Sequence, residues 1–167
     1  MLKYEFVQID YTSASSPKQR RQREHEVAYS LLDKMLLAEG TVDYEISRSE
    51  NGKPYIKDCP IHFNLSHTQG LCAVAVSDVP VGIDCEKIDT GFEGRILPFA
   101  KRYFCENELN KLNSSSDMLT TFFEIWTGKE AMIKRDGLNG SYVKMLDTTK
   151  AELKVIRYKD YIISIFK

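Results

Sequence analysis

Two carboxylates on one face of a predicted strand constrain this fold more than any other feature. The run Gly82-Ile83-Asp84-Cys85-Glu86 is largely apolar and indicates a strand. Because side chains alternate along a strand, Asp84 and Glu86 point to the same face. Two like charges side by side repel each other and resist burial unless a cation relieves the repulsion. The pattern therefore favours a metal site, and the alternative is a solvated edge strand beside Lys87.

A predicted helix over residues 117–135 carries a third carboxylate. Glu130 and Lys134 lie one turn apart in this helix, so they share a face. The alternative is an ordinary surface pair, worth about 0.2–0.5 kcal/mol. If the helix face meets the strand face, three carboxylates and one ammonium converge. Oxygen ligands of this kind suit Mg²⁺, which usually also binds water and substrate phosphates. The sequence therefore points to a metal-assisted reaction on a phosphate ester.

Helices and strands recur in a comparable order in the two halves of the chain, which indicates an α+β fold. Strands are predicted at 2–9, 61–66, 70–77, 80–86, 152–158 and 160–166, and helices at 17–39, 92–103, 106–112 and 117–135. Ser16 and Pro17 are typical of a helix start. We expect two pseudo-repeated halves, residues 1–88 and 89–167, packed into one compact unit with a cleft between them.

The composition bears on the compartment and on the partners. A chain of 167 residues is long enough for one domain with its own core. Its net charge of −1 gives no electrostatic reason to expect a nucleic acid or a membrane as partner. No apolar stretch approaches the ~20 residues of a membrane span, and none is typical of a signal peptide, so we expect a cytoplasmic protein. The four cysteines form no C-x-x-C pair, and we expect reduced, mostly buried thiols.

Other polar residues leave alternatives open when they are taken alone. His67 follows Ser66 at the end of a predicted strand and is either a hydrogen-bonded core histidine or a donor to a phosphate. Because adjacent strand residues face opposite ways, no Ser-His-Asp triad is implied. Lys53 lies in a tight turn, where a solvated lysine is the ordinary case. The basic run at 18–23 is either a solvated helix face or a site for a terminal phosphate.

The order and spacing of five motifs resemble a known family. In chain order the motifs are Gly52-Lys53-Pro54-Tyr55, Phe63-Asn64-Leu65-Ser66-His67, Gly82-Ile83-Asp84-Cys85-Glu86, Phe104-x-x-x-Glu108 and Trp126-x-x-Lys129-Glu130-Ala131-x-x-Lys134. Together they resemble the 4'-phosphopantetheinyl transferase superfamily, and within it the surfactin-synthetase-activating type, a monomer with two pseudo-repeated halves. The resemblance covers residues 50–138 and implies the 4'-phosphopantetheinyl transferase fold.

The resemblance also implies an activity and its substrates. Members of the family move the phosphopantetheine arm of coenzyme A onto a serine of an apo acyl or peptidyl carrier protein, and they release adenosine 3',5'-bisphosphate. The resemblance implies Mg²⁺ as the cofactor, with Mn²⁺ as the alternative metal. Two rival functions stay open: a Mg²⁺-dependent phosphodiesterase acting on a nucleotide, and a non-catalytic relative that binds coenzyme A or a carrier.

Roles for individual residues follow from their motif positions. The metal ligands that the resemblance implies are Asp84, Glu86 and Glu130. The coenzyme A contacts that it implies are Lys53, Ser66, His67 and Lys134. Catalytic roles fall to Glu130, as a general base acting directly or through water, and to Lys134, beside the reacting phosphate. Trp126 is expected to pack, and Glu108 matches a motif position without an assigned role.

Overall fold

Two three-stranded antiparallel sheets are built in the same way from the two parts of the chain. The computed structural model describes all residues from Met1 to Lys167. The first unit contains β1 (Leu2–Gln8), α1 (Pro17–Ala38), β4 (His62–Thr68) and β5 (Leu71–Ser77). The second contains β6 (Gly82–Lys87), α4 (Met118–Asp136), β7 (Leu153–Tyr158) and β8 (Tyr161–Phe166). The strand orders are β1-β5-β4 and β6-β8-β7, so each unit is a strand, a long helix and a hairpin whose last strand is central. The predicted α+β class with two pseudo-repeated halves is confirmed.

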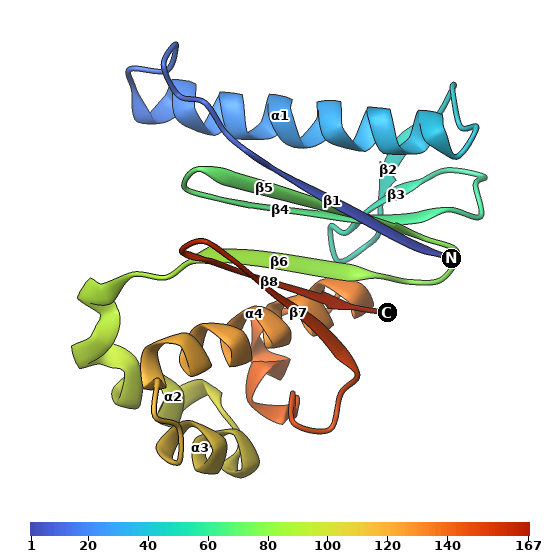
Figure 1. Ribbon diagram of the computed structural model, residues 1–167. Helices are drawn as coiled ribbons and strands as arrows, with labels where there is room; N and C mark the ends of the chain where they lie inside the picture. The colour runs from blue at the N-terminus through green and yellow to red at the C-terminus, as the bar shows by residue number, and fades with distance from the viewer.

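The layers follow from the burial of β5, the central strand of the first sheet. Every residue of β5 is buried. On one face, Cys72, Val74 and Val76 pack in the core beneath α1. On the other face, small residues at positions 73 and 75 pack against the second sheet. The order through the molecule is therefore α1, first sheet, second sheet, α4 (Figure 1).

Local sequence explains why α1 begins where it does. The Ser16 side chain accepts a hydrogen bond from the Gln19 backbone N–H, and the Gln19 side chain accepts one from the Ser16 N–H. This capping box, with Pro17 as the first helical residue, satisfies N–H groups that a helix start leaves free. The buried face contains Ala28, Leu31, Leu32, Met35 and Leu36. The predicted start of this helix is confirmed.

Shorter elements complete each unit. In the first, β2 (Ile46–Arg48) and β3 (Pro54–Ile56) form a hairpin around the turn at Asn51 and Gly52, and neither strand was predicted. In the second, the segment predicted as a single helix over 92–103 is a 3-10 helix, η1 (Thr90–Arg95), followed by α2 (Ile96–Tyr103). The remaining elements are α3 (Glu106–Asn113) and η2 (Gly140–Met145).

The strand β6 is the point at which the sequence prediction and the sheet pairing differ. The prediction ended the first half after residue 88, which places β6 with the N-terminal elements. In the structure β6 pairs with β8, so that Asp84 lies opposite Ser164 and Glu86 opposite Ile162. The repeated strand order makes β6 the first strand of the second unit. The sequence around β6 does not show its pairing with β8, because the paired residues are about eighty positions apart. Its closeness in sequence to β5 favoured placing it with the first unit.

Neither a disulfide nor a membrane span constrains the fold. All four cysteines are free, with Cys72 and Cys85 buried and Cys59 and Cys105 partly buried. None of the helices combines the length and the apolar character that crossing a bilayer requires.

Candidate active site

Side chains from three elements meet at one point: Asp84 from β6, Lys134 from α4 and Ser66 from β4. The Lys134 Nζ donates to Asp84 Oδ1 at 2.7 Å and to Ser66 Oγ at 2.9 Å. The Ser66 hydroxyl also donates to the same Asp84 oxygen, at 2.9 Å. Burial alone would lower the pKa of Lys134, but the facing Asp84 carboxylate, together with Cys85 and Glu130, offsets it, and the pKa lies above its usual value. The α4 lysine is therefore charged and fixed against β6 and β4.

The second oxygen of Asp84 has no partner. Asp84 Oδ2 is buried and accepts no hydrogen bond. Buried polar atoms are nearly always hydrogen-bonded, and an unpaired charged oxygen is especially costly. A divalent cation bound at this oxygen would remove that cost.

Glu86 and Glu130 lie close enough to Asp84 to be affected by its charge. Burial, and then the Asp84 carboxylate, raise the pKa of Glu86 to about 7. The same two causes, in the same order, raise the pKa of Glu130. Glu86 has one side-chain hydrogen bond, accepted from Thr68 Oγ1 at 3.3 Å. A cation among these three carboxylates would stabilise their charged forms, so the residues fit a divalent metal.

The three carboxylates nevertheless stand apart. Their oxygens do not all lie within 4.8 Å of one another, a spacing reached only by Cys105, Glu108 and Asp147. An octahedral ion with bonds of about 2.1 Å requires ligand oxygens closer than that. Mutual repulsion keeps like charges separated, so a shared ion would draw the Glu86 and Glu130 side chains inward.

A cleft of about 350 Å³ lies between the two units, and its link to the carboxylates is Lys134, which lines it and binds Asp84. Its lining comes from α1, the β2–β3 turn and β4 on one side and from the end of α4 on the other, and includes His25, Tyr29, Arg48, Lys53, Asn64 and Lys134. The predicted cleft between the halves is therefore present, and both predicted lysines line it.

Lys53 lines the cleft, but its ammonium forms hydrogen bonds with two backbone carbonyl groups. The Nζ donates to the carbonyl oxygens of Arg135 at 2.5 Å and Val81 at 3.3 Å. Burial is the main cause of a lowered pKa for this lysine. These partners could not be predicted, because they are backbone carbonyls more than twenty-five residues away and no sequence motif marks them.

His67 lies on the other face of β4 from the carboxylates. Ser66 and Thr68 face β6, whereas His67 faces α1, where its Nδ1 lies 3.4 Å from Glu24 Oε2. The alternation of side chains along a strand explains this separation. The structure thus places Ser66 at the carboxylates and His67 beside α1.

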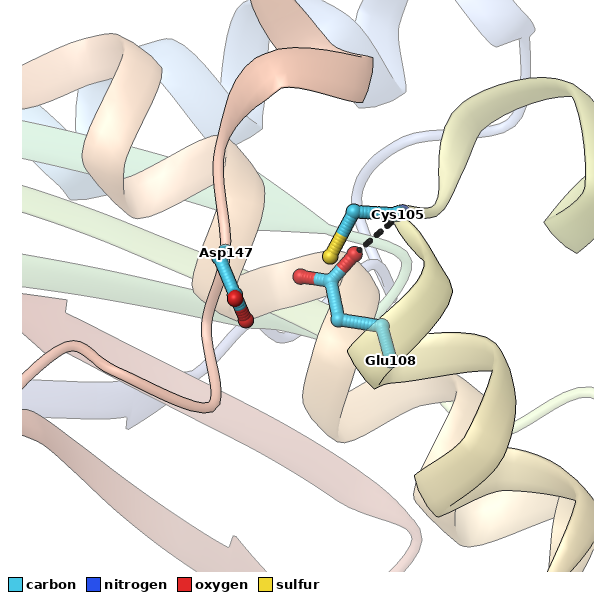
Figure 2. A group of neighbouring side chains, drawn as sticks. All are labelled: Cys105, Glu108 and Asp147. Carbon is cyan, nitrogen blue, oxygen red and sulfur yellow. Dashed lines mark hydrogen bonds between the residues drawn. The ribbon is translucent and has the colours of Figure 1, made fainter.

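Glu108 and Lys129 form a fully buried ion pair. Lys129 Nζ lies 2.7 Å from Glu108 Oε2 and donates to the carbonyl oxygens of Val143 and Leu146. Glu108 also accepts from the backbone N–H groups of Cys105 and Thr148. Figure 2 shows Glu108 on α3 reaching back to Cys105, with Asp147 opposite. Both Glu108 oxygens are occupied, so these two motif residues join α3, α4 and the loop after η2.

Trp126 packs against Phe99 and Tyr103, as expected.

Residues 80–166, just over half of the chain, match the family model of the 4'-phosphopantetheinyl transferase superfamily, so the chain belongs to that superfamily. The matched region coincides with the second unit, from β6 to β8.

The chain is similar to several curated relatives. It is 40% identical over 98 residues to the 4'-phosphopantetheinyl transferase gsp of Aneurinibacillus migulanus, covering 58% of this chain and 39% of that protein. It is 36% identical over 98 residues to the 4'-phosphopantetheinyl transferase Sfp of Bacillus subtilis strain 168, covering 57% and 42%. Against the 4'-phosphopantetheinyl transferase AcpT of Salmonella typhimurium it is 33% identical over 107 residues, covering 63% and 56%. The chain thus spans about two fifths of the length of the first two relatives.

Proposed function

We propose that this protein transfers the 4'-phosphopantetheine group of coenzyme A to a serine of an apo acyl or peptidyl carrier protein. In this reaction the serine oxygen bonds to the phosphorus that bears pantetheine. The bond from that phosphorus to the bridging diphosphate oxygen breaks, and adenosine 3',5'-bisphosphate leaves. Membership of the superfamily supports the reaction class. The observation that carries the proposal is the contact of Lys134, which lines the cleft, with Asp84, whose charge also acts on Glu86 and Glu130.

Asp84, Glu86 and Glu130 would hold the metal, Mg²⁺ or alternatively Mn²⁺. The unpartnered Asp84 Oδ2 and the raised pKa values of Glu86 and Glu130 support this choice of ligands. A bound Mg²⁺ would offset the negative charge of the diphosphate.

Lys134 would supply positive charge where negative charge gathers on the leaving group. Its ammonium is held by Asp84 and Ser66 before any substrate binds, so little reorganisation is needed during the reaction. Glu130, one turn earlier on α4, would take the proton of the attacking serine hydroxyl, directly or through water. A bound cation would keep the Glu130 carboxylate in its charged form, which is the form that accepts a proton.

The cleft between the units would hold coenzyme A. Lys134 lines it, Ser66 lies beside Lys134 at the carboxylates, and the Lys53 side chain closes one side. His67 faces α1, so a ligand that contacts it as well would pass around β4, which is an edge strand of the first sheet.

The remaining parts of the proposal concern assembly and location. We take the protein as a monomer, because the inner faces of the two sheets already cover each other. We place it in the cytoplasm, since four free thiols suit a reducing compartment.

A carrier mass-shift assay tests the proposal. The protein is incubated with coenzyme A, Mg²⁺ and apo carriers from fatty-acid, polyketide and peptide synthetases, and each carrier is weighed by mass spectrometry. Transfer predicts a gain of one phosphopantetheine on at least one carrier. Release of adenosine 3',5'-bisphosphate without a carrier would support the phosphodiesterase instead. Binding of coenzyme A without any product would support a non-catalytic relative.

A further inference from the structure

The end of α4 and the start of β6 press directly against each other. A Cβ added at Gly82 would lie 1.9 Å from the Ala131 carbonyl oxygen and 2.5 Å from the Arg135 backbone nitrogen. Real Cβ atoms do not approach backbone this closely, so only glycine permits the contact. The four site residues lie on these two elements, at positions 84, 86, 130 and 134. Their mutual distances therefore depend on how α4 sits on β6.

Lys53 reaches this contact from the β2–β3 hairpin. Its ammonium donates to the carbonyl of Arg135, in the last turn of α4, and to the carbonyl of Val81, immediately before β6. Carbonyls at a helix C-terminus lack partners within the helix and attract cations. The three segments that meet here are far apart in the sequence, and one ammonium joins all of them.

The position of Lys53 is itself fixed. Its backbone N–H donates to Ser49 Oγ, and its carbonyl accepts from the Ser49 N–H, so the residue is held within the hairpin. Gly137, with φ +64, ends α4 against the Lys53 side chain, whose Cβ lies 3.7 Å from the position of an added Gly137 Cβ. The lysine therefore lies in a closed junction, with its stem packed and its charge directed at two carbonyls.

We propose that Lys53 is a positioning residue, whose ammonium clamps the end of α4 to the start of β6 and so sets Glu130 and Lys134 against Asp84 and Glu86. The inference rests on the proposed function for what these four residues do. Arg135 directly follows Lys134, and Val81 lies three residues before Asp84, so the clamp holds the backbone next to both sides of the site. A direct contact with a substrate phosphate would require the ammonium to leave both carbonyls.

Substitutions at Lys53 distinguish the two roles. In Lys53→Met the stem remains but both hydrogen bonds are lost, so we expect turnover to fall roughly 10- to 100-fold through misplacement of the reacting groups. Mn²⁺ binding, measured by electron paramagnetic resonance without substrate, should weaken as well. Affinity for adenosine 3',5'-bisphosphate, measured by calorimetry, should stay nearly unchanged. Lys53→Arg should restore much of both lost properties, because a guanidinium also donates to two carbonyls.

Lys57→Met serves as the matched control, since Lys57 is exposed at the end of the same hairpin and pairs only with Glu45. A Lys53→Met protein with weakened nucleotide binding but normal turnover and Mn²⁺ binding would overturn the inference and make Lys53 a phosphate ligand. If the wild type transfers nothing but Lys53→Met still loses Mn²⁺ affinity, the proposed function fails and the clamp stands.

Hydrogen exchange on the wild-type protein gives a second test that needs no variant. The Leu138 N–H donates to Ile133 at the end of α4 and reports the integrity of the clamp. We expect its protection to be kept or increased when adenosine 3',5'-bisphosphate or coenzyme A binds. A loss of protection on binding would mean that the ammonium moves to the ligand, which would contradict the proposal.

Discussion

Asp84 is the residue on which the proposed metal site depends, because its two oxygens have different surroundings. One oxygen accepts from Lys134 and Ser66, and the other is buried without a partner. Asp84→Asn keeps the shape and one acceptor oxygen but removes the charge. We expect metal-dependent transfer to fall at least roughly 100-fold, since preorganised electrostatic groups commonly contribute that much. The carrier mass-shift assay measures the fall, and far-UV circular dichroism checks the fold.

The control for this change is Asp43→Asn, at an exposed position outside every helix and strand. It should leave transfer unchanged. Wild-type turnover by Asp84→Asn would contradict the proposal that Asp84 binds the metal.

The buried pair of Glu108 and Lys129 concerns stability. Lys129→Met leaves the Glu108 carboxylate buried and uncompensated, which typically costs about 3–5 kcal/mol of unfolding free energy. Urea denaturation measures this loss. Lys111→Met, at an exposed position on α3, should change the unfolding free energy by less than about 0.5 kcal/mol. Equal stability of the two variants would contradict the structural role of the pair.

At the scale of elements, the close contact of β6 with α4 is the feature that sets the site. Gly82→Ala places a methyl group 1.9 Å from a backbone oxygen, so α4 must shift away from β6. We expect a loss of about 1–3 kcal/mol in unfolding free energy, as for other overpacked sites. Transfer activity should fall as well, even at temperatures where the variant is folded.

Gly94→Ala is the matched control for this substitution, because an added Cβ at Gly94 meets nothing within 4 Å. It should be neutral or slightly stabilising. If Gly82→Ala retains wild-type transfer and stability, α4 is not held by this contact.

Local patterns predicted the elements well where the signal lies in adjacent residues. The capping residues Ser16 and Pro17 marked the start of α1, and the alternation in β6 placed Asp84 and Glu86 on one face. The strands β2 and β3 have only three residues each, too few to show a period, and both were missed. The 3-10 turn η1 was predicted as α-helix, since both have similar apolar spacing over so short a segment.

The candidate site was predictable only in part, for reasons of distance along the chain. Motif residues on β6 and α4 were identified, and the cleft beside them was expected. The hydrogen bonds of Lys53 to two backbone carbonyls were not predicted, because every residue has a backbone carbonyl and no residue type marks these two. The buried pairing of Lys129 with Glu108 likewise needed the packing of α3 on α4, although both residues stood in recognised motifs.

At the scale of the whole molecule, clustered carboxylates make stability depend on pH. The pKa of Glu86 is raised from 4.5 to about 7, chiefly by burial and then by Asp84. Between these values the unfolded chain releases a proton that the folded protein keeps. In the absence of divalent cations, the free energy of unfolding should therefore fall as pH rises through this window, and the raised pKa of Glu130 acts in the same direction.

Chemical denaturation in a chelating buffer measures this dependence. Glu86→Gln should flatten it, because the side chain no longer titrates, whereas Glu93→Gln, at an exposed position, should leave it unchanged. A stability that rises through the same window would contradict the assignment of Glu86 as a buried carboxyl beside Asp84.

A crystal structure with coenzyme A and Mn²⁺ bound tests the central claim most directly, because Mn²⁺ is identified by its anomalous scattering. The account predicts one peak that contacts oxygens of Asp84, Glu86 and Glu130 together with the diphosphate. With coenzyme A in the cleft, a peak that touches none of these carboxylates, or one that lies beside Cys105, Glu108 and Asp147, would contradict it.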